Sequence, residues 1–146
     1  MLDTQLSLEQ STLARQLVTE LQAERLQVWN LYCQIAELKP AFTSTEIRPI
    51  LSNFLQIMID YVSLGHFGVY ERLLNQAKQA ADLSRAEKLY PAFSSTTASA
   101  ISFNERYDNG KRSLKVDTLA EDLSALGENL AKRMELEDRL CSMLLH

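Results

Sequence analysis

The sequence contains few helix-breaking residues, few cysteines and few basic residues. Its 146 residues include only four glycines and three prolines, whereas sheets joined by many tight turns need more of both. Two cysteines cannot build a disulfide framework, and their spacing fits no metal site. Lys and Arg number 15 against 19 Asp and Glu, a net charge of -4. Nucleic acid and anionic membranes are therefore poor candidates for a partner, because both require a basic surface.

Long apolar runs are also absent. No segment approaches the roughly 18 consecutive apolar residues of a membrane span. The first residues, MLDTQLSLEQ, include an early acid where a signal peptide has an apolar run. A cytoplasmic protein is therefore expected. Apolar residues still make up 46% of the chain, enough for a core, and the length suits a single domain over residues 1–146.

Four long segments show helical periodicity. The first is expected over residues 7–38, where Ser7 and Gln10 form a capping box. Lys39 and Pro40 end it, because the residue before a proline avoids the helical conformation. The apolar stripe of this segment recurs at spacings of three, four or seven residues. It comprises Leu13, Leu17, Leu21, Val28, Leu31, Ile35 and Leu38.

The second segment is expected to begin near Pro49, since proline is tolerated in a first helical turn. Gly65 interrupts its apolar pattern and indicates a kink or a short break before the segment continues to about Ala81. The fourth segment is expected over residues 116–145. Its apolar residues also recur at helical spacing, and they include Leu119, Leu123, Leu126, Leu130, Met134 and Leu140.

The third segment is expected to run from Ser84 to about Tyr107. Ser84 and Glu87 form a second capping box, and Pro91 should bend the helix or delay its regular start. Short connections between long helices make neighbours antiparallel. The sequence therefore predicts an all-α, antiparallel up-down-up-down four-helix bundle whose second helix is kinked at Gly65.

Residues with functional potential concentrate around this glycine. Asp60 follows three apolar residues, so it is either solvated at the edge of the apolar face or an acidic contact flanked by aromatic residues, as in protein interfaces. His66 is most simply a hydrogen-bonded residue at the kink. Glu71 lies five positions after it and off the same helical face, so a metal site is a lesser alternative.

The fourth segment carries further acids. Glu137 and Asp138 belong either to a solvated helix face or to one acidic patch with Asp60 and Glu71. No nucleophile motif and no phosphate-binding glycine loop occurs in the sequence. Acid–base work by paired carboxylates stays open, but a protein that binds a partner without catalysis is the better interpretation.

Residues 60–71 read DYVSLGHFGVYE and resemble the signature of the Rsd/AlgQ family, the regulators of sigma D. Three further stretches are similar to that family in order and spacing. They are LKP at residues 38–40, LYP at residues 89–91 and LEDRL at residues 136–140. In addition, FNERYDNG at residues 103–110 is similar to the AlgQ branch. The resemblance covers most of the chain.

The resemblance implies a helical anti-sigma factor. Such a protein binds the primary sigma factor of RNA polymerase through its C-terminal promoter-reading domain, and blocks its engagement with core polymerase and promoter. The family positions implicated in sigma binding carry over to Leu17 and Asp60. No enzyme activity, cofactor or metal is expected, and the free protein is expected to be a monomer. The predicted partner-binding residues are Leu17, Asp60, Tyr61, Ser63, His66, Phe67, Tyr70, Glu71, Glu137 and Asp138.

Two alternatives are carried forward. The first is a small metal-binding or enzymatic bundle that uses His66, Glu71 and Glu137. The second is a diverged family member that regulates another cytoplasmic protein, because the first helix departs from the family pattern. The departures there are Thr19, Glu20 and Leu21.

Overall fold

The computed structural model describes residues 2–38, 44–76, 80–108 and 116–145, and every regular element among them is a helix. The predicted all-helical class is therefore confirmed. The elements are α1 (Leu2–Glu37), α2 (Ser44–Ser63), the π-helix η1 (Leu64–Tyr70), α3 (Glu71–Gln76), α4 (Ala80–Tyr107) and α5 (Val116–Leu145). No helix in these four stretches is both long enough and apolar enough to cross a membrane.

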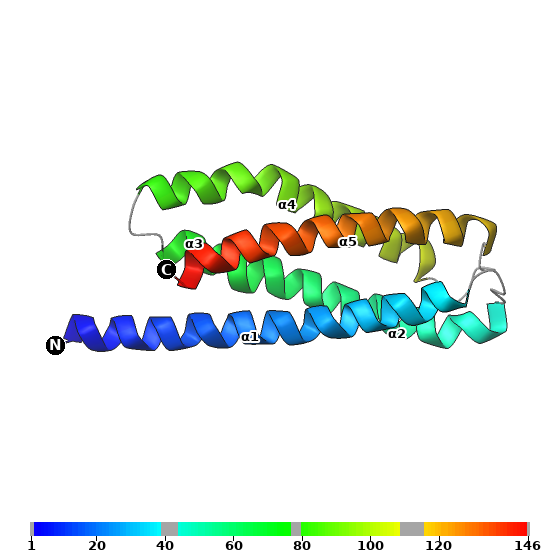
Figure 1. The fold of residues 1–146 in the computed structure, drawn as a ribbon, viewed down its shortest axis with the longest axis horizontal. Helices are drawn as coiled ribbons and strands as arrows, with labels where there is room; N and C mark the ends of the chain where they lie inside the picture. Colours follow the sequence, from blue (N-terminus) through cyan, green and yellow to red (C-terminus); the bar gives the residue numbers. More distant parts are fainter. Residues whose placement is uncertain (1, 39–43, 77–79, 109–115, 146) are drawn as a thin grey trace.

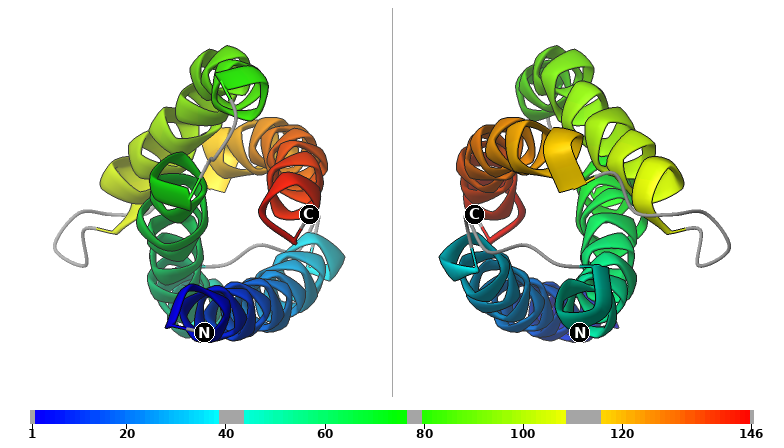
Figure 2. Two further views of the ribbon diagram at one scale, coloured as in Figure 1. Left: turned by 90° about the vertical axis from the view of Figure 1, so that its left-hand side faces the viewer. Right: turned by 90° about the vertical axis from the view of Figure 1, so that its right-hand side faces the viewer.

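The helices form four rods, because α2, η1 and α3 follow one another without interruption. We refer to these three elements, residues 44–76, as the second rod. In Figure 1, α1 leads away from the N-terminus, the second rod returns beside it, α4 leads away again and α5 returns to the C-terminus. The end-on views of Figure 2 show the rods around a common centre. α1 packs against α2 and α5, and α4 packs against the same two helices.

Three predicted helix boundaries are confirmed. α5 covers Val116–Leu145, and α4 ends at Tyr107. The predicted start of the first helix at Ser7 is wrong, because α1 already begins at Leu2. A serine followed three residues later by glutamine also fits the solvated face of a helix interior, so the pattern does not by itself mark a start.

α4 likewise begins before its predicted start at Ser84. Its first residue is Ala80, and Asp82 supplies the first turn with the negative charge that a helix N-terminus favours. Asp82 also pairs with Arg85, Oδ1 to Nη2, at 2.5 Å. Pro91 lies inside α4 and does not delay its start.

The second rod begins at Ser44, before the predicted start near Pro49, because a proline marks only the neighbourhood of a helix start. The rod is not broken at Gly65. From Leu64 onward its hydrogen bonding follows the π pattern, in which the N–H of Glu71 donates to the carbonyl five residues back. The glycine-containing segment thus stays helical while its register changes.

The buried core follows an alternating spacing of three and four residues. On α1 the predicted stripe is confirmed at Leu21, Val28 and Ile35, which are fully buried, but its first two positions are shifted by one residue. Leu13 is 45% exposed whereas Ala14 is only 2% exposed, and Leu17 is half-buried. The buried positions of α5 include two charged residues. Its buried side chains are those of Leu119, Leu123, Leu126, Leu130, Arg133, Leu136, Glu137, Leu140, Cys141 and Leu144.

A polar cluster joins the end of α4 to the beginning of α5. The hydroxyl of Tyr107 and Nη1 of Arg106 both donate to Oδ2 of Asp122, the latter over 2.7 Å. Tyr107 also hydrogen-bonds the hydroxyl of Thr118 at 3.2 Å. Burial opposes ionisation of Asp122, but these hydrogen bonds and the charge of Arg106 outweigh it and lower its pKa.

We expect this carboxylate to stabilise the fold in a pH-dependent way. Because the pKa of Asp122 is lower in the folded than in the unfolded state, its contribution is complete above the ordinary value of 3.8 and is lost as the pH falls through the folded value. Urea unfolding at several pH values should therefore separate wild type from Asp122→Asn at neutral pH but not in strong acid. Glu121→Gln, which removes an exposed acid of the same helix beyond its first turn, is the control. An equal difference at every pH would contradict this assignment.

Candidate binding site

The second rod turns a row of side chains away from the bundle. Within residues 60–71 the exposed side chains are those of Asp60, Ser63, Phe67 and Glu71. They recur every three or four residues and so lie on one face of the rod, which we name the outer stripe. The ring of Phe67 is 65% exposed. A large apolar group thus sits in water between polar and acidic neighbours, as is typical of an interaction site.

Leu17 lies where α1 meets η1. Gly68 faces it, and a Cβ there would lie 3.4 Å from Leu17 Cδ2 and 3.0 Å from Leu64 Cδ1. The glycine therefore lets the first helix approach the second rod closely. As a half-buried apolar residue at this junction, Leu17 is accessible from outside while its position is held by packing.

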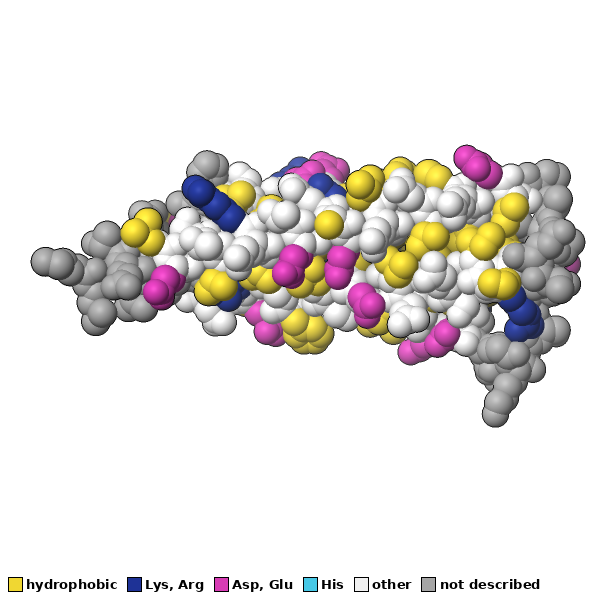
Figure 3. All heavy atoms as spheres, turned by 90° about the horizontal axis from the view of Figure 1, so that it is seen from below, with side chains coloured by type: hydrophobic (Ala, Val, Ile, Leu, Met, Phe, Trp, Pro, Cys, Tyr) yellow, Lys and Arg dark blue, Asp and Glu magenta, His cyan; other side chains and the backbone are white. Residues whose placement is uncertain are grey.

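Carboxylates gather between α1 and the second rod. Glu24 is half-buried, and its Oε2 has no hydrogen-bond partner among the described residues. Burial raises the pKa of Glu24, and the charges of Asp60 and Glu20 raise it further. Figure 3 shows acidic side chains along the middle of the face over α1 and α2. A cationic group bound to this face would offset the repulsion between these carboxylates.

On the inner side of the second rod lies a buried ion pair. Arg133 and Glu137, one turn apart on α5, are 0% and 1% exposed. Arg133 Nε donates to Glu137 Oε2 over 3.1 Å. Buried charges persist only when they are paired and hydrogen-bonded, so the remaining atoms of both groups need partners from other helices.

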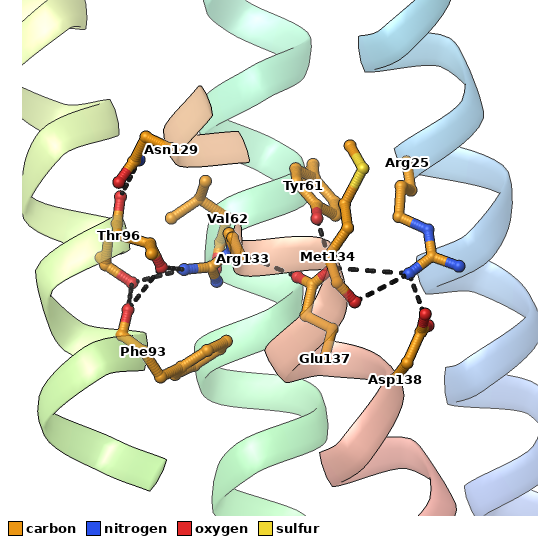
Figure 4. A network of polar contacts seen from close by, with 11 residues as sticks. Arg25, Tyr61, Val62, Phe93, Thr96, Asn129, Arg133, Met134, Glu137 and Asp138 are labelled. Carbon is orange, nitrogen blue, oxygen red and sulfur yellow. Dashed lines mark hydrogen bonds and ion pairs between the residues drawn. The ribbon is translucent and has the colours of Figure 1, made fainter. Parts of the chain in front are cut away.

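Arg133 finds its partners on α4 and α2 (Figure 4). Its Nη1 donates to the hydroxyls of Thr96 and Thr97 over 3.1 Å and 2.7 Å. Its Nη2 donates to the carbonyl of Val62 over 3.0 Å. The guanidinium also lies 4.2 Å from the ring centroid of Phe93, a cation–π distance. One side chain thus joins three helices.

Glu137 completes the connection to the other rods. Its Oε1 accepts a hydrogen bond from the hydroxyl of Tyr61 on α2 and lies 3.9 Å from Nη1 of Arg25 on α1. The same Nη1 bonds Oδ1 of Asp138 at 2.8 Å. Together with Arg133, this carboxylate forms contacts with every rod of the bundle.

Desolvation dominates the electrostatics of the pair. Burial raises the pKa of Glu137, although Arg133, Tyr61 and Arg25 all favour its ionised form. Burial likewise lowers the pKa of Arg133, although Glu137 opposes that change. Burial and the neighbouring carboxylate both raise the pKa of Tyr61. Since the cost of burial outweighs attraction in both partners, the pair is a weak source of stability.

His66 packs among aromatic rings. Its ring lies parallel to that of Phe93, with centroids 6.1 Å apart and planes at 7°, and it also contacts Phe67, Tyr70 and Tyr90. In the described part of the chain, no group hydrogen-bonds its buried Nδ1. The predicted hydrogen bond of His66 is therefore not formed by Nδ1, and the imidazole instead packs against four aromatic rings.

The structure divides the predicted partner-binding residues into two groups. Asp60, Ser63, Phe67 and Glu71 share the outer stripe, with Leu17 at its side and His66 half-buried behind it. The other four residues are either buried in the bundle or already paired with another side chain. Tyr61, Tyr70 and Glu137 are buried, and exposed Asp138 is bound by Arg25.

Both interpretations of Glu137, a solvated helix face and one acidic patch with Asp60 and Glu71, are consequently wrong. This carboxylate faces the core because position 137 belongs to the three-and-four spacing of the buried α5 residues. The same spacing contains position 133, so Arg133 could have been recognised as a core residue. We missed it because an arginine in an amphipathic helix is normally exposed.

The ligand set of the metal alternative is not assembled. Glu71 is exposed, His66 is half-buried and Glu137 is bonded to Arg133 and Tyr61. Within the described ranges, no three His, Cys, Asp or Glu side chains come together as metal ligands.

The two glycines of η1 provide a test of this geometry. A Cβ at Gly65 would lie 2.9 Å from Arg133 Nη2 and 3.0 Å from Glu137 Oε2, whereas a Cβ at Gly68 would meet only leucine side-chain tips. We expect Gly65→Ala to lower the free energy of unfolding by about 1–3 kcal/mol, because the buried pair cannot move aside. Gly68→Ala should change it far less, since leucine tips can shift and alanine favours helix. Equal stability of the two variants in urea unfolding would contradict the rigid pair.

Comparisons with known proteins agree on one family. A family model described as "Regulator of RNA polymerase sigma(70) subunit, Rsd/AlgQ" matches residues 1–145. A regulator of sigma D from Yersinia enterocolitica is 32% identical over 120 residues, covering 75% of this chain and 68% of the relative. Its counterpart from Shigella dysenteriae is 34% identical over 99 residues, covering 65% and 61%. No solved structure gave a significant match. With the family model covering nearly its whole length, the chain belongs to the Rsd/AlgQ family.

Proposed function

We propose that this protein is an anti-sigma factor that binds the C-terminal promoter-reading domain of the primary sigma factor through the outer stripe and Leu17. Family membership supports the choice of partner. The observation that carries the choice of surface is the outer stripe itself, because it lies in the segment that resembles the family signature. There, an acid and an exposed aromatic ring are presented together by a rigid helix.

The mechanism is competition for a basic surface. A sigma domain that reads promoter DNA presents basic side chains to phosphates and a helix to the major groove. Asp60 and Glu71 offer negative charge to the same side chains, while Phe67 and Leu17 provide apolar anchors. A sigma domain covered in this way can contact neither core polymerase nor promoter, so transcription from its promoters falls.

The buried members of the predicted set support this surface from behind. Tyr61 and Glu137 hold each other inside the bundle, and Tyr70 packs on His66 and Phe93. Their role in the proposal is to position the second rod. Asp138 is paired with Arg25 across α1 and α5 and is assigned a secondary role in attracting the partner.

The proposal includes an antiparallel up-down-up-down arrangement with a bend at Gly65. The chain direction in Figure 1 supports the arrangement. The change to π hydrogen bonding beside Gly65 supports the bend, since π turns often distort a helix. We further propose that the protein acts without catalysis, as a monomer when free, in the cytoplasm where RNA polymerase works.

We expect Asp60→Ala and Leu17→Ala each to weaken sigma binding at least tenfold, about 1.4 kcal/mol, because each removes a group at the centre of the contact. Isothermal titration with the purified sigma domain measures the change, and thermal unfolding verifies the fold. Asp117→Ala and Leu26→Ala remove an exposed acid and an exposed leucine elsewhere and serve as controls. Binding curves that are unchanged for the first two variants would refute the proposed surface.

We also expect binding to depend on the ionisation of Glu24. Its pKa is raised in the free protein, first by burial and then by Asp60 and Glu20, and a basic partner should lower it. Affinity should therefore be highest above the free-state pKa and fall as the pH is lowered through it, with uptake of a proton when the complex dissociates.

Glu24→Gln provides the test, because it removes the titrating group and keeps the shape of the side chain. The variant should bind sigma with a flatter pH dependence in the acid range. The sigma domain's own titration is common to both measurements and cancels in the comparison. Identical pH profiles for the two proteins would exclude Glu24 from the interface.

A further inference from the structure

Aromatic side chains of the second rod and of α4 meet at the surface of the bundle. The ring of His66 contacts two exposed rings, with centroids 4.9 Å from Phe67 and 6.0 Å from Tyr90. Phe67 is 65% exposed and Tyr90 is 39% exposed. We name these three residues the aromatic patch. It continues the outer stripe, because Phe67 belongs to both, and it extends that surface onto α4.

Buried rings hold the aromatic patch in place. Tyr70 packs against Tyr90, with ring centroids 5.1 Å apart, and Phe93 lies parallel to His66. Tyr70 and Phe93 are themselves buried and stacked on each other. Rings that are packed in this way lose little conformational freedom when a partner covers them. The patch is therefore preorganised for binding.

Two exposed acids adjoin the patch. Glu71 follows Phe67 by four residues and Glu87 precedes Tyr90 by three, so each acid lies on the same side of its helix as the ring. Burial raises the pKa of Tyr70, and Tyr90 and Glu87 raise it further, as expected for a Glu87 carboxylate close to the rings. In the described part of the chain, neither acid forms an ion pair.

The same group of rings already packs against one guanidinium inside the bundle. Arg133 lies 4.2 Å from the ring centroid of Phe93 and is paired with Glu137 (Figure 4). A planar cation is thus held there by an aromatic ring and a carboxylate together. The exposed patch offers the same two kinds of group. Within the described ranges, no cation lies over the rings of Phe67 or Tyr90.

An arginine of the partner matches this surface better than other side chains. Its guanidinium can stack flat on a ring while its N–H groups donate to carboxylates at the edge. A lysine lacks the flat face, and an apolar side chain would desolvate the acids without pairing them. Lys88 cannot occupy the place from within, because it lies about 160° around α4 from Tyr90. A domain that reads promoter DNA presents arginines to phosphates.

We propose that Tyr90 and Glu87 of α4 extend the binding surface, and that the aromatic patch, with Glu71 and Glu87 at its edges, binds an arginine side chain of the sigma domain. The inference rests on the proposed function and names one chemical group of that partner. Tyr90 is a specificity-determining residue in this arrangement, because its ring favours a guanidinium over an ammonium. None of the predicted partner-binding residues lies on α4.

Substitutions at Tyr90 separate a stacked arginine from a simple apolar contact. Tyr90→Phe keeps the ring and should bind the purified sigma domain within about twofold of wild type. Tyr90→Leu keeps an apolar side chain without the ring and should weaken binding at least about fivefold, within the range of a cation–π contact. Isothermal titration measures both, and thermal unfolding verifies the fold. Equal affinities of the two variants would overturn the proposal.

The acid of α4 is tested through its charge. Glu87→Gln should slow association with the sigma domain at least about threefold at low salt, and the difference should shrink as salt is added. Stopped-flow mixing at two salt concentrations measures this effect. Matched controls on the same helix are Glu105→Gln and Ile101→Ala, which change an exposed acid and an exposed apolar residue away from the patch. A Glu87→Gln variant that associates like these controls would overturn the role of α4.

Replacing each arginine of the sigma domain by lysine, one at a time, identifies the bound group. At one position the change should weaken binding to the wild-type protein at least about fivefold. It should have little effect on binding to Tyr90→Leu, because the ring is already missing there. If no arginine shows this coupling, the proposal is refuted.

Failure of the proposed function has a different signature. If the wild-type protein does not bind the sigma domain, the proposed partner is wrong and this inference falls with it. If Asp60→Ala and Leu17→Ala weaken the complex while Tyr90→Leu and Glu87→Gln do not, the proposed function stands and the extension onto α4 is refuted. If Tyr90→Leu does not fold, Tyr90→Met takes its place with the same expected loss of affinity.

Discussion

Two charges shielded from water lie at the centre of this bundle, and their need for partners links all four rods. Arg133 and Glu137 are held by groups on α1, α2 and α4. Apolar side chains could fill the same volume, but their contacts have no direction and tolerate small movements of the helices. Hydrogen bonds lose strength quickly when their geometry changes. A polar centre therefore restricts the positions of the rods, including the second rod that carries the outer stripe, more than it stabilises them.

The sequence predicts the fold best where apolar residues recur most regularly. The class, the range of α5 and the end of α4 at Tyr107 were predicted correctly, because regular leucines and a strong turn signal define them. The starts of α1 and α4 were predicted incorrectly. The capping-box pattern at Ser7 and Ser84 can also occur at solvated positions inside a helix. Arg133 and Glu137 occupy core positions of that periodicity. Glu137 was predicted to lie on the surface and Arg133 was not considered, because the chemistry of both side chains, taken alone, favours water.

The candidate site was predicted from a family resemblance and not from apolar periodicity. Its errors concern which side chains are exposed. The resemblance of residues 60–71 to a family signature located the segment, but it could not say which of its side chains face outward. That division follows from how the second rod packs against the other three rods, which buries Tyr61 and Tyr70 and leaves Phe67 and Glu71 exposed. A glycine in a helical pattern indicates a kink, a break or a register change equally well. The π hydrogen bonding of Leu64–Tyr70 shows that the segment stays helical and is not broken there.

In the proposed complex, charge and apolar area have different roles in recognition. Burial raises the pKa of Glu24, and the negative charges of Asp60 and Glu20 raise it further. A cation on this surface would offset that repulsion, whereas an acidic partner would increase it, so the surface favours basic partners. Salt screens such attraction, whereas the contact area of Phe67 and Leu17 is insensitive to it. The acids should therefore govern the association rate and the choice of partner. The two apolar anchors, Phe67 and Leu17, should govern the lifetime of the complex.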